Sequence, residues 1–420
     1  MKKVLVIGSG GREHAIVDAL SRSPQVDRIY CAPGNAGIAA QAECVPIRDT
    51  DIQALVAFAT ANAIDLTVVG PEASLSAGVV DAFRAAGLKI FGHTKAATEI
   101  ESSKEFAKVL MEKYGIPTAA YRSFSSYSKA LGYVRAGRFP TVLKYDGLAA
   151  GKGVVIANDL EEAEAALKDM LQDHRFGEGK VVIEEFLTGP EFSFMCFVNG
   201  EDVYPMPLAQ DHKRAFDNDK GPNTGGMGAY TSLPFITVED RTFALEHILR
   251  RTAAAMASEG RPLSGVLYGG LMKTPDGIKV IEFNARFGDP ETEVVLPLLD
   301  SDIFDILEAV ATGRKTAGPL WSSDVTLGVV LASKGYPGTY EKGHGITLPD
   351  NDPTIYHMGT AVDGGSLVTA GGRVLMCVAR ASGIAEARDA AYKIVRGVKC
   401  DNLFHREDIA HIAMETIDKQ

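Results

Sequence analysis

Residues Lys144 to Val154 read KYDGLAAGKGV: a lysine near the end of an apolar strand, a glycine-rich loop and a second apolar run. The Walker pattern for phosphate binding is not met, because Gly147 and Gly151 are one residue too close and Gly153 stands where Ser or Thr would coordinate Mg²⁺. The stretch instead predicts a β-hairpin whose backbone N–H groups fold over a triphosphate, with Lys144 reaching phosphate oxygens from its strand. A surface hairpin without a ligand is the alternative for this segment taken alone.

The chain upstream of this hairpin alternates short strands with helices. Within residues 1–100 the strand-like runs are KVLVIG, RIYCA, LTVVG and KIFG, and we predict helices over 15–20, 52–61 and 77–86. Such alternation is typical of a parallel, doubly wound sheet. We therefore expect an open α/β domain at the N-terminus.

Three loops follow strands of this expected sheet. The first, Gly8 to Glu13 (GSGGRE), opens a helix and so favours phosphate binding, with a ligand-free turn as the alternative. A nicotinamide dinucleotide is disfavoured, because Glu13 replaces the third glycine and the second strand ends in APGN without an acidic residue. The other two loops contain Asn35 and Glu72. Because such loops converge beyond the carboxyl ends of the strands, we expect one small phosphorylated ligand there.

Beyond the hairpin, strands separated by one predicted helix over 160–171 indicate a mixed α+β unit. Within it, IEEFL (183–187) followed by Glu191 offers the apolar walls, backbone groups and carboxylate that a nucleotide base and its ribose need, but a solvated sheet edge fits equally well. The charged run 211–214 is most simply a solvated turn. We also predict a helix over 238–256 and, from about residue 325, a small C-terminal α/β domain.

The strand VIEFN, residues 280–284, runs into ARFGDPE. The two-residue period of a strand places Glu282 and Asn284 on one face. Their oxygens suit Mg²⁺, which usually keeps water and substrate phosphates in its other positions. Arg286, just beyond, can neutralise phosphoryl charge. The alternative is a structural ion pair between Glu282 and Arg286.

Composition narrows the classes of partner. The chain has 420 residues, 43 Lys and Arg against 54 Asp and Glu, a net charge of −11 and 46% hydrophobic residues, which predicts roughly two to four domains. An acidic chain without a basic run argues against nucleic-acid binding. Five scattered cysteines fit neither a disulfide scaffold nor a zinc cluster, and no run is apolar enough for a membrane span. We expect a cytoplasmic protein.

Nine motifs, taken in order, resemble the glycinamide ribonucleotide synthetase family, the phosphoribosylamine–glycine ligases of the ATP-grasp superfamily: GSGGREH, APGNAG, VGPE, KYDGLAAGKG, IEEFL, QDHKR, GPNTGGMGAY, IEFNARFGDPE and GGRVL. They span essentially the whole chain. The resemblance implies an ATP-grasp fold with a Rossmann-like N-terminal domain (1–102), an ATP-grasp domain (103–324) that contains a nucleotide-clamping subdomain at about 120–190, and a small C-terminal α/β domain (325–420).

The resemblance also implies an activity: ATP-dependent ligation of glycine to 5-phosphoribosylamine through a glycyl phosphate, in purine biosynthesis, with Mg²⁺ or Mn²⁺, by a monomer or weak dimer. The implied nucleotide contacts are Lys104, Lys144, Gly151, Lys152, Gly153, Glu184, Glu185, Phe186, Leu187 and Glu191. The implied metal ligands are Glu282 and Asn284. The implied substrate contacts are Gly10, Gly11, Arg12, Asn35, Glu72, Asp211 and Arg373, and the implied catalytic residues are Arg286, Asp289 and Lys213.

Two positions depart from the superfamily pattern. The strand before Glu282 reads GGLM (269–272), where many ATP-grasp enzymes carry a second metal carboxylate, and Tyr145 stands where a small residue is expected and would narrow the hinge of the loop. The alternatives are another ATP-grasp ligase or a formate-using transferase acting on a phosphoribosyl amine, and a nucleotide-binding protein without catalysis. RFGDPE argues against the first two, and the presence of both metal ligands argues against the third.

Overall fold

The N-terminal strands form a five-stranded parallel sheet, as the alternation of strands and helices predicts. The computed structural model describes residues 1–147, 153–350 and 354–419. The strand order is β3-β2-β1-β4-β5, with bounds β1 (Lys2–Gly8), β2 (Val26–Pro33), β3 (Glu43–Cys44), β4 (Leu66–Val69) and β5 (Ile90–Phe91). Helix α1 (Gly11–Ser21) follows β1, and α2 (Ile52–Ala61) matches its predicted bounds.

The helix predicted over 77–86 is wrong in its bounds. The chain forms two helices, α3 (Glu72–Ala77) and α4 (Val79–Ala85), which meet at Gly78. Gly78 has φ +92°, a left-handed conformation that ends the first helix and that glycine adopts without strain. Because α3 begins directly after β4, Glu72 lies at the carboxyl end of the sheet.

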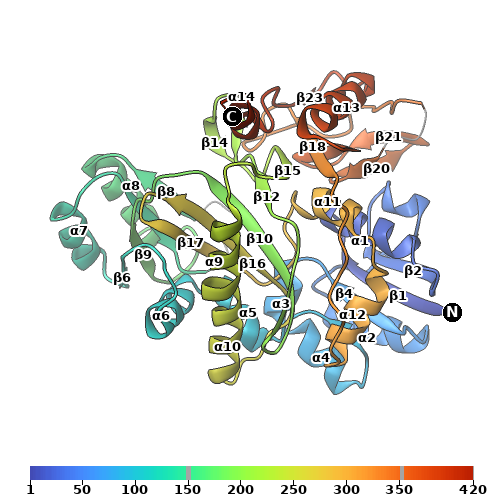
Figure 1. The fold of residues 1–420 in the computed structure, drawn as a ribbon, viewed down its shortest axis with the longest axis horizontal. Helices are drawn as coiled ribbons and strands as arrows, with labels where there is room; N and C mark the ends of the chain where they lie inside the picture. The colour runs from blue at the N-terminus through green and yellow to red at the C-terminus, as the bar shows by residue number, and fades with distance from the viewer. Residues whose placement is uncertain (148–152, 351–353, 420) are drawn as a thin grey trace.

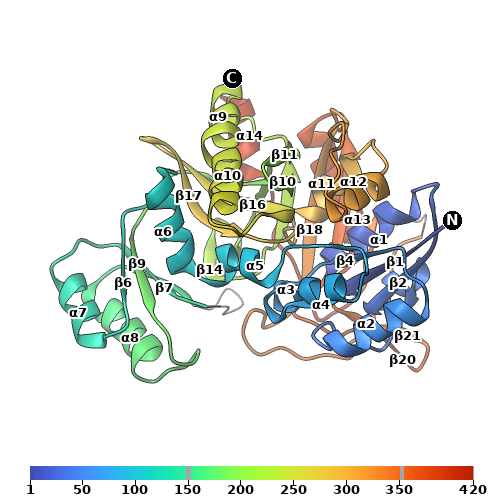
Figure 2. The ribbon, with the colours of Figure 1, turned by 90° about the horizontal axis from the view of Figure 1, so that it is seen from below.

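A separate lobe, here called the small lobe (residues 121–185), extends to the left in Figures 1 and 2. Its antiparallel sheet has the order β6-β9-β7-β8, with bounds β6 (Tyr121–Phe124), β7 (Thr141–Tyr145), β8 (Val154–Ala157) and β9 (Val181–Glu185). Helices α7 (Tyr127–Arg135), which the sequence did not predict, and α8 (Leu160–Leu171) pack together beside it. Tyr145 is buried in the core of this lobe, with its ring centroid 5.2 Å from that of Phe176.

A ten-stranded sheet forms the centre of the molecule. Its main path is β17-β16-β10-β12-β15-β18-β22-β19, and β11 and β23 pair with β10 and β18. The bounds are β10 (Glu191–Asn199), β11 (Asp202–Pro205), β12 (Ala209–Asp211), β15 (Gly228–Thr231), β16 (Ser264–Thr274), β17 (Gly277–Asn284), β18 (Val325–Ser333), β19 (Ile355–His357), β22 (Arg373–Ala381) and β23 (Leu403–Phe404). The sheet is continuous across residue 324, because β15 pairs with β18.

Helices cover the two faces of this sheet. Two helices precede the strands of this sheet in the sequence: α5 (Lys95–Ser102), which was not predicted, and α6 (Lys104–Tyr114). The helix predicted over 238–256 is one helical run with a π-helical segment inside it: α9 (Val238–Phe243), the segment Ala244–Leu249 and α10 (Arg250–Ser258). The remaining helices are α11 (Thr292–Val295), α12 (Ile303–Ala311), α13 (Ile384–Gly397) and α14 (His411–Asp418), and two short hairpins pair β13 (Arg214–Phe216) with β14 (Lys220–Asn223) and β20 (Thr360–Asp363) with β21 (Ser366–Thr369).

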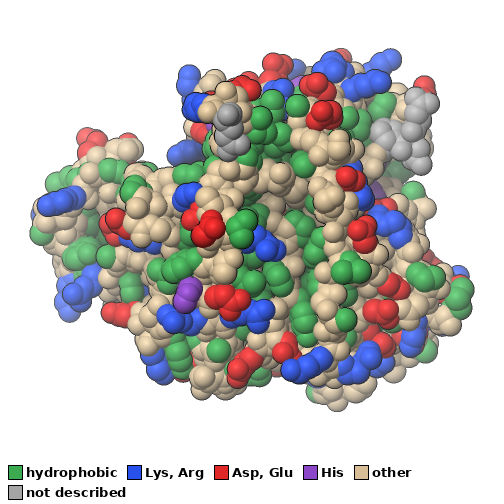
Figure 3. All heavy atoms as spheres, viewed as in Figure 1, with side chains coloured by type: hydrophobic (Ala, Val, Ile, Leu, Met, Phe, Trp, Pro, Cys, Tyr) green, Lys and Arg blue, Asp and Glu red, His purple; other side chains and the backbone are tan. Residues whose placement is uncertain are grey.

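The surface mixes both signs of charge. On the face in Figure 3, Lys and Arg side chains are interspersed with Asp and Glu. In the part of the chain that the structure describes, none of the helices combines the length and apolar character needed to cross a membrane.

Candidate functional site

A cavity of about 920 Å³ lies where the N-terminal domain, the small lobe and the ten-stranded sheet meet. The predicted residues that line it are Arg12, Glu72, Lys104, Lys144, Gly153, Glu184, Asp211, Lys213, Glu282, Asn284, Arg286, Asp289 and Arg373. The predicted residues that are not part of its lining are Gly10, Gly11, Asn35, Glu185, Phe186, Leu187 and Glu191. Gly151 and Lys152 lie outside the described residues.

The N-terminus of α6 brings Lys104 to this cavity. Ser103 caps the helix by accepting from the backbone N–H of Phe106 at 3.1 Å, and the Asp146 carboxylate accepts from the N–H of Glu105 at 3.1 Å. A carboxylate at this end of a helix is favoured by the helix dipole. The Nζ of Lys104 donates to the Gly147 carbonyl oxygen at 3.1 Å, so the helix holds the start of the glycine-rich loop.

Lys144 approaches the same cavity from β7. Its Nζ donates to the carbonyl oxygen of Ile281 at 2.9 Å and lies 3.0 Å from Glu184 Oε1. The other Glu184 oxygen, Oε2, lies 2.9 Å from the Nζ of Lys108. Of the paired glutamates in IEEFL, Glu184 is therefore a buried partner of two lysines, whereas Glu185 is exposed.

Glu282 and Asn284 lie on β17 and both face the cavity, as the period of the strand predicts. Burial raises the pKa of Glu282, but Lys213, Lys144 and Lys104 together outweigh it and hold the pKa below its usual value. The two residues supply hard oxygen ligands for Mg²⁺ beside lysines suited to phosphate. No cluster of three or more His, Cys, Asp or Glu with metal-binding geometry occurs within residues 1–147, 153–350 and 354–419. This donor set fits a metal that takes its remaining ligands from water and phosphate.

Arg286 is held by two carboxylates. Its Nε lies 3.1 Å from Glu72 Oε2 and 3.2 Å from Glu101 Oε1, and its Nη2 donates to Asn284 Oδ1 at 3.3 Å. The alternative ion pair with Glu282 is not among the ion pairs of the described residues. Burial raises the pKa of Glu101, while Arg286 opposes that shift. The guanidinium therefore sits beside the candidate metal ligands in a fixed orientation.

The first N-terminal turn, predicted to bind phosphate, is occupied by its own carboxylate. Glu13 Oε2 accepts from the backbone N–H of Gly10 at 2.6 Å, and Glu13 Oε1 accepts from Arg12 Nε at 2.7 Å. A side chain at Gly70 would collide with Glu13, because its Cβ would lie 1.9 Å from Oε1. Of this turn, Arg12 is the predicted residue that reaches the cavity.

Asn35 joins loops of the protein. Its Nδ2 donates to the carbonyl oxygens of Ser9 at 2.8 Å and His357 at 2.7 Å, and its Oδ1 accepts from the N–H groups of Gly37 at 2.9 Å and Ile38 at 3.0 Å. These four bonds use both hydrogens and both lone pairs of the amide. In this structure Asn35 therefore shapes the site through the loops that it holds.

The run 211–214 is not a solvated turn, because Asp211 and Lys213 both line the cavity. The Nζ of Lys213 lies 2.7 Å from Glu191 Oε2. Burial raises the pKa of Asp211, and Lys213 opposes that shift. The structure thus links Glu191, a predicted nucleotide contact, to Lys213, a predicted catalytic residue.

Arg373 and Asp289 form an ion pair in the lining of the cavity. The Nη1 of Arg373 lies 2.8 Å from Asp289 Oδ1 and donates to the carbonyl oxygen of Gly225 at 2.7 Å. The hydroxyl of Tyr336 accepts from the N–H of Gly225 at 2.9 Å. The GPNTGGMGAY motif and the C-terminal strand β22 therefore meet beside this ion pair.

Sequence reasoning missed several residues that line the cavity: Glu101, Lys108, Tyr268, Glu291 and Tyr336. Two of them carried a readable signal. Thr94 caps α5 and so marks the helix that carries Glu101, and Lys108 follows Lys104 by one helical turn on the same face. Tyr268 and Ser193 both donate to Glu291 Oε1, at 2.5 and 2.8 Å, across strands whose pairing local sequence does not reveal.

Comparison with known families decides which proteins this chain is related to. Three models match consecutive parts of it: the phosphoribosylglycinamide synthetase N domain at residues 2–101, the ATP-grasp (A) domain at 102–292 and the C domain at 326–412. The chain belongs to the phosphoribosylglycinamide synthetase family.

Curated relatives support this membership over the full length. A phosphoribosylamine–glycine ligase of Halalkalibacterium halodurans is 52% identical over 416 residues, which cover 98% of this chain and 97% of the relative. One of Listeria innocua is 51% identical over 413 residues, which cover 97% and 98%.

Solved structures place the fold in the same family. The phosphoribosylamine–glycine ligase of Thermotoga maritima has a TM-score of 0.84 at 34% identity and covers 97% of this chain and 100% of its own. A biotin carboxylase domain from Hydrogenobacter thermophilus, at 15% identity and a TM-score of 0.75 over 100% of this chain and 94% of its own, shares the fold alone. Like its family, this chain has the three-part ATP-grasp architecture predicted from the motifs.

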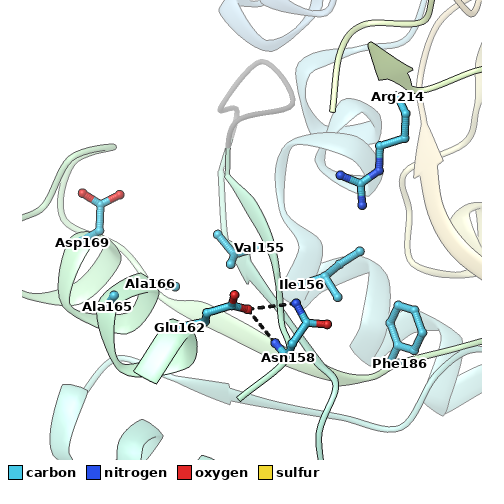
Figure 4. Close-up of a pocket in the computed structure, with 9 residues that line it drawn as sticks. All are labelled: Val155, Ile156, Asn158, Glu162, Ala165, Ala166, Asp169, Phe186 and Arg214. Atoms are coloured by element: carbon cyan, nitrogen blue, oxygen red, sulfur yellow. Dashed lines mark hydrogen bonds between the residues drawn. The ribbon is translucent and has the colours of Figure 1, made fainter. Parts of the chain in front are cut away.

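Phe186, which the family resemblance implies to be a nucleotide contact, lines a second cavity of about 680 Å³. Figure 4 shows it together with Val155 and Ile156 of β8, while Arg214 lies across from them. Asn158 Nδ2 donates to Glu162 Oε2 at 3.0 Å on the side of α8. Within the segment IEEFL (183–187), Glu184 therefore lines the large cavity and Phe186 lines the smaller one.

Proposed function

We propose that this chain ligates glycine to 5-phosphoribosylamine with ATP, giving glycinamide ribonucleotide, ADP and phosphate in purine biosynthesis. The observation that carries the proposal is the convergence of Lys104, Lys144, Arg286 and the pair Glu282 and Asn284 on one cavity. Membership of the phosphoribosylglycinamide synthetase family indicates which reaction these residues support.

ATP and Mg²⁺ (or Mn²⁺) are assigned to the part of the cavity between the small lobe and β17. Glu282 and Asn284 would hold the metal, which neutralises phosphate charge when bound. The residues assigned to the nucleotide are Lys104, Lys144, Gly151, Lys152, Gly153, Glu184, Glu185, Phe186, Leu187 and Glu191. Although the chain is acidic overall, a few lysines at this site and backbone N–H groups would bind the polyphosphate.

In the first step, an oxygen of the glycine carboxylate attacks the γ-phosphorus, the bond to the β-phosphate oxygen breaks, and ADP leaves. Lys144 and Lys104 orient the phosphates, and Arg286, fixed by Glu72 and Glu101, stabilises the charge that develops on the transferred group. Such a reaction needs positioning and charge stabilisation and no nucleophilic side chain.

In the second step, the amine nitrogen of phosphoribosylamine attacks the acyl carbon of glycyl phosphate, the C–O bond to phosphate breaks, and the nitrogen loses a proton. We assign Asp289 to the amine or ribose and Arg373 to the 5-phosphate. The further residues assigned to substrate contact are Arg12, Glu72 and Asp211, and Lys213 is assigned a catalytic role. Gly10, Gly11 and Asn35 are assigned to the same substrate site through the loops that they form. Closure of the glycine-rich loop would keep water from the acyl phosphate.

Isotope transfer tests this proposal. Glycine labelled with ¹⁸O in its carboxylate is incubated with the purified chain, ATP, Mg²⁺ and phosphoribosylamine. We expect phosphate release to require both substrates, with one ¹⁸O atom transferred to each phosphate. Phosphate release without glycine, or unlabelled phosphate, would contradict the proposed reaction.

The same proposal includes action in the cytoplasm as a monomer or weak dimer. It also includes the division of the chain after residues 102 and 324, with a nucleotide-clamping subdomain at about 120–190.

A further inference from the structure

Lys108 is a buried lysine with no role in the reaction described above. It lies on α6 one helical turn beyond Lys104, is 2% exposed and lines the large cavity. Its Nζ lies 2.9 Å from Glu184 Oε2 and donates to Thr118 Oγ1 at 2.8 Å. Thr118 Oγ1 in turn donates to the carbonyl oxygen of Val280 on β17 at 2.8 Å. Lys108 thus fixes Glu184 of the small lobe relative to the central sheet.

The two carboxylate oxygens of Glu184 have different partners in the protein. Oε2 is held by Lys108, whereas Oε1 is buried and accepts no hydrogen bond from the described residues, although the Nζ of Lys144 lies 3.0 Å away. Buried acceptors in folded proteins almost always have a donor. Because Glu184 lines the cavity, Oε1 is placed to accept an N–H from a molecule bound there.

We propose that Lys108 is a positioning residue that makes the nucleotide site selective for a base with an amino group. By holding Oε2 it fixes the orientation of the Glu184 carboxylate and directs Oε1 at the 6-position of the bound purine. The adenine amino group donates to that oxygen, whereas the 6-carbonyl of hypoxanthine or guanine is an acceptor and opposes it. The inference rests on the proposed function only in placing the nucleotide in this cavity.

Charge balance explains why Lys108 is needed beside Lys144. The proposed reaction has Lys144 contacting the phosphates of the nucleotide, which draws that cation away from Glu184. Lys108 is then the remaining cation at the carboxylate, and an unpaired buried carboxylate is costly. Burial lowers the pKa of Lys108 to about 8, and Glu184 opposes that shift, so the carboxylate favours the charged form of Lys108.

Nucleotide binding without the other substrates tests this inference. The affinities of ADP and inosine diphosphate, which differ only at the 6-position, are measured with Mg²⁺ by titration calorimetry for the full chain and for Lys108→Met. We expect ADP to bind the wild type at least about tenfold more tightly than inosine diphosphate. In Lys108→Met the ADP affinity should fall about tenfold and the preference should approach unity.

Kinetics supply a second readout. In Lys108→Met the KM for ATP should rise about tenfold, while the KM for glycine and kcat at saturating ATP change less than about threefold. Lys108→Arg should recover most of the preference because it keeps the cation. Lys113→Met is the matched control, since Lys113 is on the same helix with a side chain 59% exposed and should leave both affinities unchanged.

Two further variants guard against misfolding and indirect effects. If Lys108→Met does not fold, Thr118→Val removes one hydrogen bond to Lys108 and should lower the preference in the same direction. Glu184→Gln should lower it too, and adding Lys108→Met to that variant should cause little further loss because the two residues act as a unit.

Equal weakening of both diphosphates in the Lys108 or Thr118 variants would overturn the inference, as would a wild type without preference. Selective ADP binding that depends on Lys108, in a chain that makes no product from glycine, would uphold this inference while contradicting the proposed function.

Discussion

At the residue scale, Glu282 is the carboxylate on which most of the positive charge of the site converges. Lys104, Lys144 and Lys213 all hold its pKa down, and Asn284 lies beside it on the same strand face. Replacing Glu282 with Gln removes the charge and weakens the metal site. We expect roughly 100-fold lower activity at a fixed Mg²⁺ concentration and a higher Mg²⁺ requirement, measured by steady-state kinetics over a metal titration.

Asp276→Asn is the control for that change. Asp276 lies at the turn of the same β16–β17 hairpin with a side chain 81% exposed, so its loss should leave the metal titration unchanged. Glu282→Gln with an unaltered Mg²⁺ requirement would remove Glu282 from the metal site.

Individual site residues were predictable where strand or helix periodicity acts alone. The alternation along β17 put Glu282 and Asn284 on one face, and both do line the cavity. Glu101 was not predictable in its role, because its carboxylate accepts from the N–H of Ala285, a residue 184 positions away. Asn35 shows the same limit, since a loop amide that seemed free for ligand has four partners in the protein.

At the scale of elements, α6 and the glycine-rich loop are joined by Asp146. Its carboxylate accepts from the Glu105 N–H at the first turn of α6, and Ser103 Oγ donates to it at 3.2 Å. We expect Asp146→Ala to lower the free energy of unfolding by about 1 kcal/mol through the lost helix-end interaction. Because Gly147 is the next residue, the KM for ATP should also rise several-fold, as measured by urea unfolding and initial rates.

Asp159→Ala separates these two effects. Asp159 caps α8 by accepting from the N–H of Glu162 at 2.9 Å and does not line the large cavity. Its loss should lower stability by a similar amount of about 1 kcal/mol and leave the KM for ATP unchanged. A raised KM in both variants would show that the effect is one of stability alone.

Among the elements, α2 and α8 were predicted with their observed bounds, because an apolar helical period marks each of them and a capping aspartate precedes it. The break at Gly78 was not, since a glycine within an apolar helical pattern is locally compatible with an unbroken helix. The order of the ten strands depends on pairings between distant residues, and local sequence does not specify these. The family resemblance, not periodicity, supplied the ATP-grasp fold.

At the scale of the whole molecule, buried neutral histidines join the parts. His93 is fully buried; its Nε2 lies 2.8 Å from the carbonyl oxygen of Val266, and its Nδ1 accepts from the N–H of Ser264 at 3.0 Å. His14 accepts at Nδ1 from the N–H of His357 at 2.8 Å, linking α1 to β19. These contacts tie the N-terminal domain to the ten-stranded sheet at two places.

Acid should loosen these contacts. Burial lowers the pKa of His93 from 6.5 to about 4, so the unfolded chain binds a proton more readily than the folded one. The stabilisation is complete above pH 6.5 and is lost as pH falls toward about 4. We expect His93 alone to lower the free energy of unfolding by about 3 kcal/mol as the pH falls from 6.5 to about 4.

The measurement is urea unfolding of the wild type and His93→Gln at intervals between pH 7 and about 4. Because the variant has no titrating group at this position, the stability difference between the two proteins should shrink as pH falls. A constant difference across this range would mean that His93 does not titrate differently in the two states.

The pairing of β15 with β18 makes the C-terminal part of the chain structurally inseparable from the rest. Three motif-based domains suggest a modular protein, yet a cut after residue 324 would remove β18 and leave β15 as an unprotected sheet edge. Such an edge presents a row of unpaired N–H and C=O groups to any other extended chain. During synthesis, the nascent chain therefore carries an aggregation-prone edge until its last quarter has emerged and closed the sheet.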